Sequence, residues 1–103
     1  MFLPYCVYIL ISLKDKKLYI GFTTDIKRRF NEHNSGKSRS TSTRRPLQLI
    51  FCEYYHSKTD ALRREEYFNT NKGKRALKLM LQDSLQKFEH VSLFPKLVPD
   101  NKQ

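Results

Sequence analysis

The sequence has little that would support a zinc site, a membrane span or a second domain. Its two cysteines, Cys6 and Cys52, lie far apart in apolar segments and form neither a C-x-x-C pair nor a Cys/His spacing. The apolar start, residues 1–13, is shorter than the ~20 residues of a span and lacks the basic start and small-residue cleavage site of a signal peptide. These absences predict one reduced, cytoplasmic domain without a membrane partner. A single disulfide between the two cysteines stays open as an alternative.

Acidic residues are also scarce, and their scarcity predicts the kind of partner. The chain of 103 residues has 10 Asp and Glu against 20 Lys and Arg, which gives a net charge of +10 and a pI near 9.8. Such an excess favours a polyanion, and nucleic acid is favoured over a membrane because the basic residues alternate with aromatics and with Ser or Thr. The alternative is a highly soluble basic domain whose charges meet only water.

The order of apolar and polar segments predicts three strands and three helices. Strands are expected where β-branched and aromatic residues concentrate, and helices where a capping residue precedes an apolar stripe. The polar residues 12–17 are short enough to close a hairpin between the first two strands. The predicted strands are 5–11, 18–22 and 47–55, and the predicted helices are 26–35, 58–69 and 74–88.

The first predicted helix combines a core stripe with two polar residues that share a face. Ile26 and Phe30 are four residues apart and are expected in the core, while Arg29 and His33 have the same spacing beside them. The following residues 35–45 contain no apolar side chain, which predicts a basic, hydroxyl-rich and mobile surface loop that contacts phosphates. An ordinary flexible connector is the alternative.

The second helix places a carboxylate where apolar residues are expected. On a helical wheel Glu65 lies in the middle of the inward stripe, and Asn69, one turn on, shares its face. An ionised carboxylate there costs several kcal/mol unless it is paired or coordinated. A structural salt bridge is the commoner explanation, and metal coordination is the other. The stripe consists of Ala61, Leu62 and Phe68.

Gly73 is expected to separate the second helix from a last amphipathic one, followed by a loosely held tail, residues 89–103. The inward residues of the last helix are predicted to be Leu77, Met80, Leu81 and Leu85. The tail residues expected to pack back onto the domain are Leu93, Phe94, Leu97 and Val98.

Taken together, four segments resemble the GIY-YIG nuclease superfamily, and in particular its small stand-alone members related to the excinuclease nuclease domain. The matching segments are Cys6-Val7-Tyr8, Tyr19-Ile20-Gly21, DIKRRFNEHNSGKSRST and ALRREEYF. The resemblance extends over residues 5–76, and it is specific because five separated positions agree in type and order. Cys6 departs from the pattern, which has Gly there, at a backbone and packing position.

The resemblance implies an α/β (α+β) fold for residues 1–88, with a three-stranded antiparallel sheet flanked by helices. It implies metal-dependent hydrolysis of phosphodiester bonds, in which Tyr8 and Tyr19 are the paired active-site tyrosines and Arg29 holds the scissile phosphate. The resemblance also implies that His33 assists proton transfer and that Glu65 binds Mg²⁺ or Mn²⁺. One carboxylate suits Mg²⁺, which keeps waters and phosphate oxygens in its shell.

Several alternatives stay open at this point. Either Tyr8 or His33 could be the general base. The favoured function is a DNA endonuclease of repair or recombination; the others are a non-catalytic nucleic-acid-binding module and an RNA- or ribosome-associated protein. The oligomeric state is not predicted, although cutting both strands with one site allows a transient dimer on DNA. The expected nucleic-acid contacts are Lys27, Arg28, Lys37, Arg39, Arg44, Arg45, Lys72 and Lys74.

Overall fold

A computed structural model describes residues 2–89 of the chain. The predicted tail contacts of Leu93, Phe94, Leu97 and Val98 lie outside these residues. The elements in order are β1 (Tyr5–Ser12), β2 (Leu18–Thr23), α1 (Ile26–Asn34), the 3-10 helix η1 (Ser42–Arg44), β3 (Leu47–Tyr55), α2 (Lys58–Phe68), α3 (Asn71–Met80) and α4 (Gln82–Glu89).

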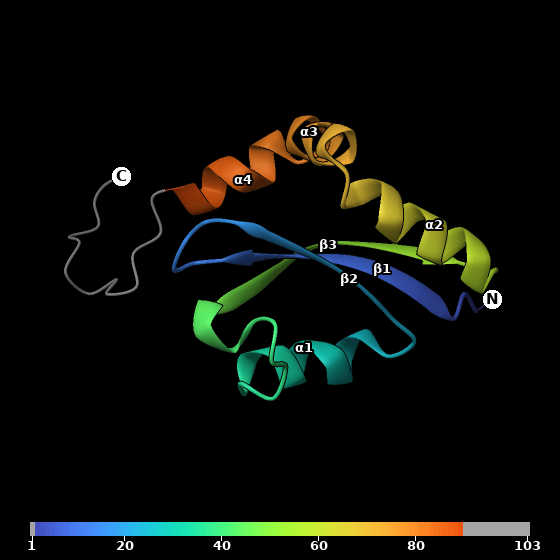
Figure 1. Ribbon diagram of the computed structural model, residues 1–103, viewed down its shortest axis with the longest axis horizontal. Helices are drawn as coiled ribbons and strands as arrows, with labels where there is room; N and C mark the ends of the chain where they lie inside the picture. The colour runs from blue at the N-terminus through green and yellow to red at the C-terminus, as the bar shows by residue number, and fades with distance from the viewer. Residues whose placement is uncertain (1, 90–103) are drawn as a thin grey trace.

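The three strands form one antiparallel sheet in the order β2-β1-β3, as the sequence predicts. The central strand β1 is buried from Cys6 to Ser12, which explains its almost uninterrupted apolar sequence. Strand β2 is an edge strand, and the polar turn predicted between residues 12 and 17 joins it to β1. Helix α1 lies on one side of the sheet, and α2, α3 and α4 lie on the other (Figure 1).

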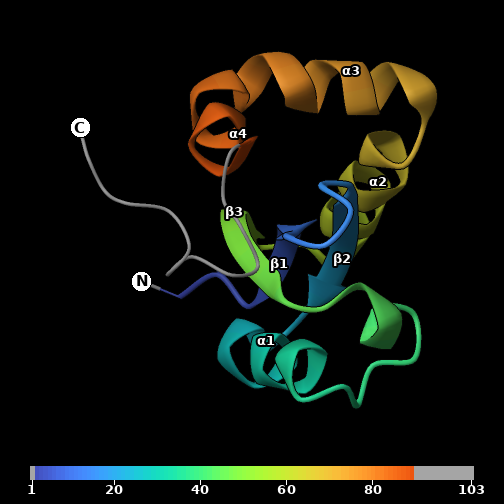
Figure 2. The same cartoon turned by 90° about the vertical axis from the view of Figure 1, so that its left-hand side faces the viewer.

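The two faces of the sheet therefore carry two separate cores. Val7 and Ile9 point towards α2, α3 and α4, where they pack with Phe68 and Leu77. The alternate β1 residues belong to the core on the α1 side, together with the predicted stripe of α1. A register shift opposite Ile9 and Leu10 inserts one extra residue into β3. Figure 2 shows the sheet between these two layers.

The C-terminal helices differ from the sequence prediction in two ways. A single helix beginning after Gly73 is wrong, because Gly73 lies inside the first turn of α3 and its amide donates to Oγ1 of the capping Thr70 at 3.0 Å. A Cβ atom at Gly73 would overlap the carbonyl of Tyr67, so the glycine allows α3 to begin against the end of α2. The helical stretch is then interrupted at Leu81, which separates α3 from α4.

The inward side chains of these helices differ from the prediction at one position. Leu77 and Leu81 are buried as predicted, and Leu85 packs against the same core. The prediction that Met80 is inward is wrong: it is 47% exposed, because this last residue of α3 lies about 60° round the helix from the buried Leu77, at the edge of the stripe. Within residues 2–89, no helix combines the length and apolar character needed to cross a membrane.

Candidate active site

The site begins at the one position where β1 and β2 need a glycine. Tyr8 lies directly opposite Gly21 in the antiparallel register, on the sheet face that is covered by α1. A Cβ atom at position 21 would overlap the ring and hydroxyl of Tyr8. The glycine of Tyr19-Ile20-Gly21 therefore provides the space that the buried Tyr8 side chain occupies.

Helix α1 brings a histidine to the Tyr8 hydroxyl. The side chain of Asp25 caps α1 by accepting from the amide of Arg28, and His33 lies in the last turn with no exposed surface. Its Nε2 atom is 2.8 Å from the Tyr8 hydroxyl, and its Nδ1 atom is 2.7 Å from Oγ1 of Thr41. Tyr8, His33 and Thr41 thus form a buried chain of hydrogen bonds in which both ring nitrogens have a partner.

Tyr19 completes an aromatic cluster around this chain. Its ring lies edge-on to the His33 ring, with centroids 5.0 Å apart, and 6.2 Å from the ring of Tyr8. Tyr19 is only partly buried, whereas Tyr8 is 1% exposed. The two tyrosines that the family resemblance pairs lie on the same sheet face, and Tyr19 is the one nearer to solvent.

Arg29 is the cation of the cluster. Its guanidinium donates to Oε1 of Glu32 at 2.9 Å and to Oγ of Ser38 at 3.3 Å. Burial lowers the pKa of Arg29, but the Glu32 hydrogen bond and the nearby Tyr8 outweigh burial, so the net shift is upward and the side chain keeps its charge. With 30% of its side chain exposed, Arg29 can still reach a ligand from outside.

Burial and the charge of Arg29 also shift the pKa values of Tyr8 and His33. Burial raises the pKa of Tyr8 above its ordinary value, Tyr19 adds to the rise, and Arg29 opposes it. Burial, aided by the charge of Arg29, lowers the pKa of His33 to about 4, although Glu32 acts in the other direction. At neutral pH the free protein therefore holds a protonated phenol beside a neutral imidazole.

The segment after α1 contributes to the site, which corrects part of the prediction of an exposed loop over residues 35–45. Most of these residues are exposed as predicted, but Ser38 is 5% exposed and Thr41 has no exposed surface. The prediction is wrong at these two residues because it equates the absence of apolar residues with exposure. Small hydroxyl side chains can be buried when they have hydrogen-bond partners, and Arg29 and His33 supply these. No pattern in a single sequence distinguishes Thr41 from the serines and threonine around it.

Glu65 does not contact this cluster. It lies on α2, on the opposite side of the sheet from α1, and the edge strand β2 runs between them (Figure 1). The prediction that Glu65 lies in the middle of an inward stripe is wrong in degree. Ala61 and Phe68 are buried, but Leu62 is 39% exposed and Glu65 is half-buried, because α2 meets the sheet along a narrower face. Asn69 donates to the backbone carbonyl of Glu65, not to its carboxylate.

The surroundings of Glu65 fit a single-carboxylate ion site. Burial raises the pKa of its carboxyl, and no hydrogen bond or ion pair to that carboxylate occurs within residues 2–89. The neighbouring Arg64 is bonded to Glu53 instead, at 3.0 and 3.1 Å. Over the same residues, no three His, Cys, Asp or Glu side chains are grouped to hold a metal. A hard ion that keeps most of its waters, such as Mg²⁺ or Mn²⁺, is the kind this residue could bind.

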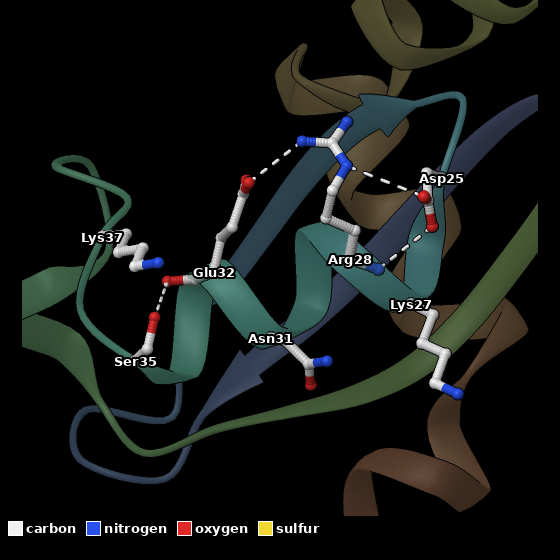
Figure 3. Close-up of a pocket in the computed structure, with 7 residues that line it drawn as sticks. All are labelled: Asp25, Lys27, Arg28, Asn31, Glu32, Ser35 and Lys37. Atoms are coloured by element: carbon white, nitrogen blue, oxygen red, sulfur yellow. Dashed lines mark hydrogen bonds and ion pairs between the residues drawn. The ribbon is translucent and has the colours of Figure 1, made fainter.

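Three of the eight predicted nucleic-acid contacts, Lys27, Arg28 and Lys37, line one pocket on α1 (Figure 3). The volume of this pocket is about 590 Å³. Arg28 is paired there with Asp25 and Glu32, so this surface is less positive than the sequence suggests. Contact with nucleic acid stays a prediction for these three residues and for Arg39, Arg44, Arg45, Lys72 and Lys74.

Gly21→Ala is expected to destabilise the fold by about 1–3 kcal/mol, because the added methyl overlaps Tyr8 in a packed layer. The measurement is urea denaturation. The control is to make Gly21→Ala in the Tyr8→Ala variant, which lacks the overlapping ring. There Gly21→Ala should lower the free energy of unfolding by at least about 1 kcal/mol less than it does in the wild type. An equal cost in both backgrounds would show that the Tyr8 contact is not the reason for the glycine.

His33 is expected to make stability fall as the pH is lowered. Its pKa is near 6.5 in the unfolded chain and about 4 in the folded protein. As the pH falls below about 6.5 the unfolded chain takes up the proton first, so stability is lost until the pH reaches about 4. The loss attributable to His33 is about 3 kcal/mol.

The check is the free energy of unfolding between pH 7 and pH 4 for the wild type and His33→Gln. The wild-type curve should fall more steeply, while His56→Gln, at an exposed position, should follow the wild type. Parallel curves for the wild type and His33→Gln would contradict the prediction.

Comparison with known proteins agrees with this arrangement. A family model described as the GIY-YIG catalytic domain matches residues 4–78. The UPF0213 protein SH2523 of Staphylococcus haemolyticus is 41% identical over 75 residues, which are 72% of this chain and 90% of that protein. The UPF0213 protein SAG0778 of Streptococcus agalactiae is 44% identical over 66 residues, covering 63% and 74%. The solution NMR structure of the UPF0213 protein BH0048 from Bacillus halodurans matches with a TM-score of 0.50 at 30% identity, covering 85% of this chain and 98% of that one.

The fold and the cluster define a small α+β domain with two tyrosines on a hairpin and an arginine and a histidine on the following helix. The chain belongs to the GIY-YIG catalytic domain family. Membership implies nuclease-type activity and a nucleic acid as the substrate. None of the three proteins named above is called an excinuclease, so that closer relation stays a prediction.

Proposed function

We propose that this protein is a divalent-metal-dependent endonuclease that hydrolyses phosphodiester bonds in DNA. The observation that carries the proposal is the hydrogen-bonded chain from Tyr8 through His33 to Thr41, with the charge of Arg29 beside it. A domain that only binds nucleic acid needs surface cations but has no use for a buried tyrosine–histidine pair. A role in DNA repair or recombination stays a prediction of the family resemblance.

Arg29 and Tyr19 are the members of the cluster that can meet the substrate. Both side chains are partly exposed, and the guanidinium keeps its positive charge. Arg29 would bind the scissile phosphate and stabilise the negative charge that develops on it during attack. Glu32 and Ser38 hold the guanidinium in place, so little reorganisation is needed when the phosphate arrives.

Tyr8 and His33 act together as the proton acceptor, which joins the two bases that the sequence leaves as alternatives. A phenol with a raised pKa is not ionised beforehand, but the Tyr8 hydroxyl is positioned to donate to Nε2 of a neutral His33. Because Tyr8 itself is buried, the attacking water would have to reach its hydroxyl past the partly exposed Tyr19. Tyr8 would then take a proton from this water while its own proton moves to Nε2. A bound phosphate offsets the charge of Arg29, which is one cause of the low His33 pKa, and thereby makes His33 a better acceptor.

Glu65 would hold Mg²⁺ or Mn²⁺, through the half-buried carboxylate for which residues 2–89 supply no cation. Through that ion, Glu65 would place positive charge near the oxygen that leaves the phosphorus. The edge strand β2, which carries Tyr19 on one face and contacts α2 on the other, separates the two halves of the site. A phosphodiester lying across this edge would reach both halves.

The test is incubation of nicked, branched and supercoiled DNA with the protein and Mg²⁺ or Mn²⁺, beside Glu65→Ala and a chelator control. Cleavage is expected for the wild type only, and only with the metal present. If the wild type and Glu65→Ala are equally inert on every substrate while both bind DNA, the nuclease function is wrong and a binding module is the better description. Cleavage or binding of RNA alone would identify RNA as the substrate.

A further inference from the structure

A second basic pocket lies beside the candidate active site. It has a volume of about 330 Å³ and borders three elements, namely the turn between β1 and β2, the end of η1, and α3. Five of its six lining residues are cations and none is acidic. The lining residues are Lys16, Lys17, Leu18, Arg44, Lys74 and Lys78.

The cations on α3 have no acid on their own helix. Helix α3 contains no Asp or Glu, and Lys74 and Lys78 lie one turn apart on the same face, both exposed. Like charges at this spacing cost a helix roughly 0.2–0.5 kcal/mol, which an anion bound between them would offset. The pair is therefore easier to explain as a binding feature than as a stabilising one.

Arg44 gives the pocket one fixed wall. Its Nε lies 3.3 Å from the carboxylate of Asp15, and another guanidinium nitrogen donates to the carbonyl of Leu18 at 3.4 Å. The backbone carbonyl of Arg44 accepts from the Ser12 hydroxyl at 2.6 Å. These contacts hold Arg44 against the hairpin on one side of the pocket, and the exposed side chains of Lys74 and Lys78 line the other side.

The pocket and the active site share two segments of chain. Leu18, on the pocket wall, directly precedes Tyr19 of the aromatic cluster on strand β2. Arg44 follows three residues after Thr41, which binds His33. Leu18 packs on the opposite face of the sheet from Tyr19, so a polynucleotide that meets both the pocket and the cluster must pass around the edge strand β2.

We propose that this pocket binds a second phosphodiester group of the nucleic acid whose scissile phosphate meets Arg29. The inference rests on the proposed function and deepens it, because it makes the substrate a polynucleotide that extends past the cleaved bond towards the β1–β2 turn. Nucleic acid is favoured over a membrane surface, since the pocket continues a site that already gathers phosphate-binding side chains. Lysines and an arginine that contact a phosphate read charge and not base sequence.

The experiment compares two double variants that remove the same charge. Lys74→Ala/Lys78→Ala alters the pocket, and Lys58→Ala/Lys87→Ala removes two exposed lysines from α2 and α4. Binding of a labelled DNA duplex, of RNA of the same sequence and of anionic phospholipid vesicles is measured in chelator between about 50 and 200 mM salt. Thermal melting of each variant verifies that it is folded.

The pocket variant is expected to bind DNA roughly five- to tenfold more weakly at low salt and to lower the slope of log affinity against log salt by about 1. The control pair should keep the wild-type slope. Equal slopes for the two double variants would overturn the proposal, as would a loss of vesicle binding without any loss of DNA binding. A matching loss on RNA would support recognition of the phosphodiester itself. Because the binding assay contains a chelator, it tests the pocket independently of whether the wild type cleaves DNA.

Discussion

Glu65→Gln is expected to lower the rate of DNA cleavage by at least about 10²–10³-fold, the loss typical of removing one preorganised electrostatic contact. Glutamine keeps the size of the side chain but lacks the negative charge. A hard divalent ion with only one carboxylate ligand depends on that charge. DNA binding measured without metal should be unchanged. The matched control is Glu66→Gln at the next, exposed position, which should cleave like the wild type.

The same variant separates a catalytic from a structural role for Glu65. Burial raises the pKa of this carboxyl, so the folded state disfavours its charge at neutral pH, and Glu65→Gln should unfold at the same or a higher denaturant concentration. A structural salt bridge would behave in the opposite way, because its removal strands a buried partner and costs several kcal/mol. Cleavage at the wild-type rate, or a large loss of stability, would each contradict the proposed role.

Tyr8→Phe is expected to reduce cleavage by about 10²–10⁴-fold while DNA binding is kept, because it removes the hydroxyl that contacts Nε2 of His33 but leaves the ring that fills the space above Gly21. Some stability should also be lost, about 1–3 kcal/mol, since a buried ring nitrogen is left without its partner. Cleavage under single-turnover conditions and urea denaturation measure the two effects.

Tyr54→Phe is the control for this substitution. Tyr54 is also a strand tyrosine, but it lies on β3 and is 47% exposed, so losing its hydroxyl should leave cleavage unchanged. A Tyr8→Phe rate within tenfold of the wild type would show that the Tyr8 hydroxyl is not the proton acceptor. In that case Tyr19, the more exposed phenol, becomes the residue to test.

The elements that local patterns specify were predictable from the sequence. Strand β3 occupies the predicted residues 47–55, and α1 begins at the predicted residue 26. The four-residue spacing of Arg29 and His33 correctly places both beside the α1 core. Each of these features depends on neighbours a few residues away, which a single sequence displays directly.

The errors came from contacts that the local sequence pattern does not display. Gly73 has the pattern of a helix breaker, although its lack of a side chain lets α3 pack against the carbonyl of Tyr67. Thr41 lies in a segment without apolar residues, and only the approach of His33 from α1 gives it a buried role. The helical wheel places Glu65 on the side of α2 that carries Ala61 and Phe68. How deeply Glu65 is buried on that side depends on how the whole helix packs against the sheet.

By itself, the sequence determined the basic charge, the hairpin and following helix, and the set of residues that resembles a nuclease site. Those properties follow from composition and short spacings. The tertiary structure alone decided that Tyr8, His33 and Thr41 share one buried hydrogen-bonded chain and that α2, the helix of Glu65, lies on the other side of the sheet from α1. Proton-acceptor strength and metal affinity depend on burial and on charges brought together across the fold, and these quantities exist only once the chain has packed.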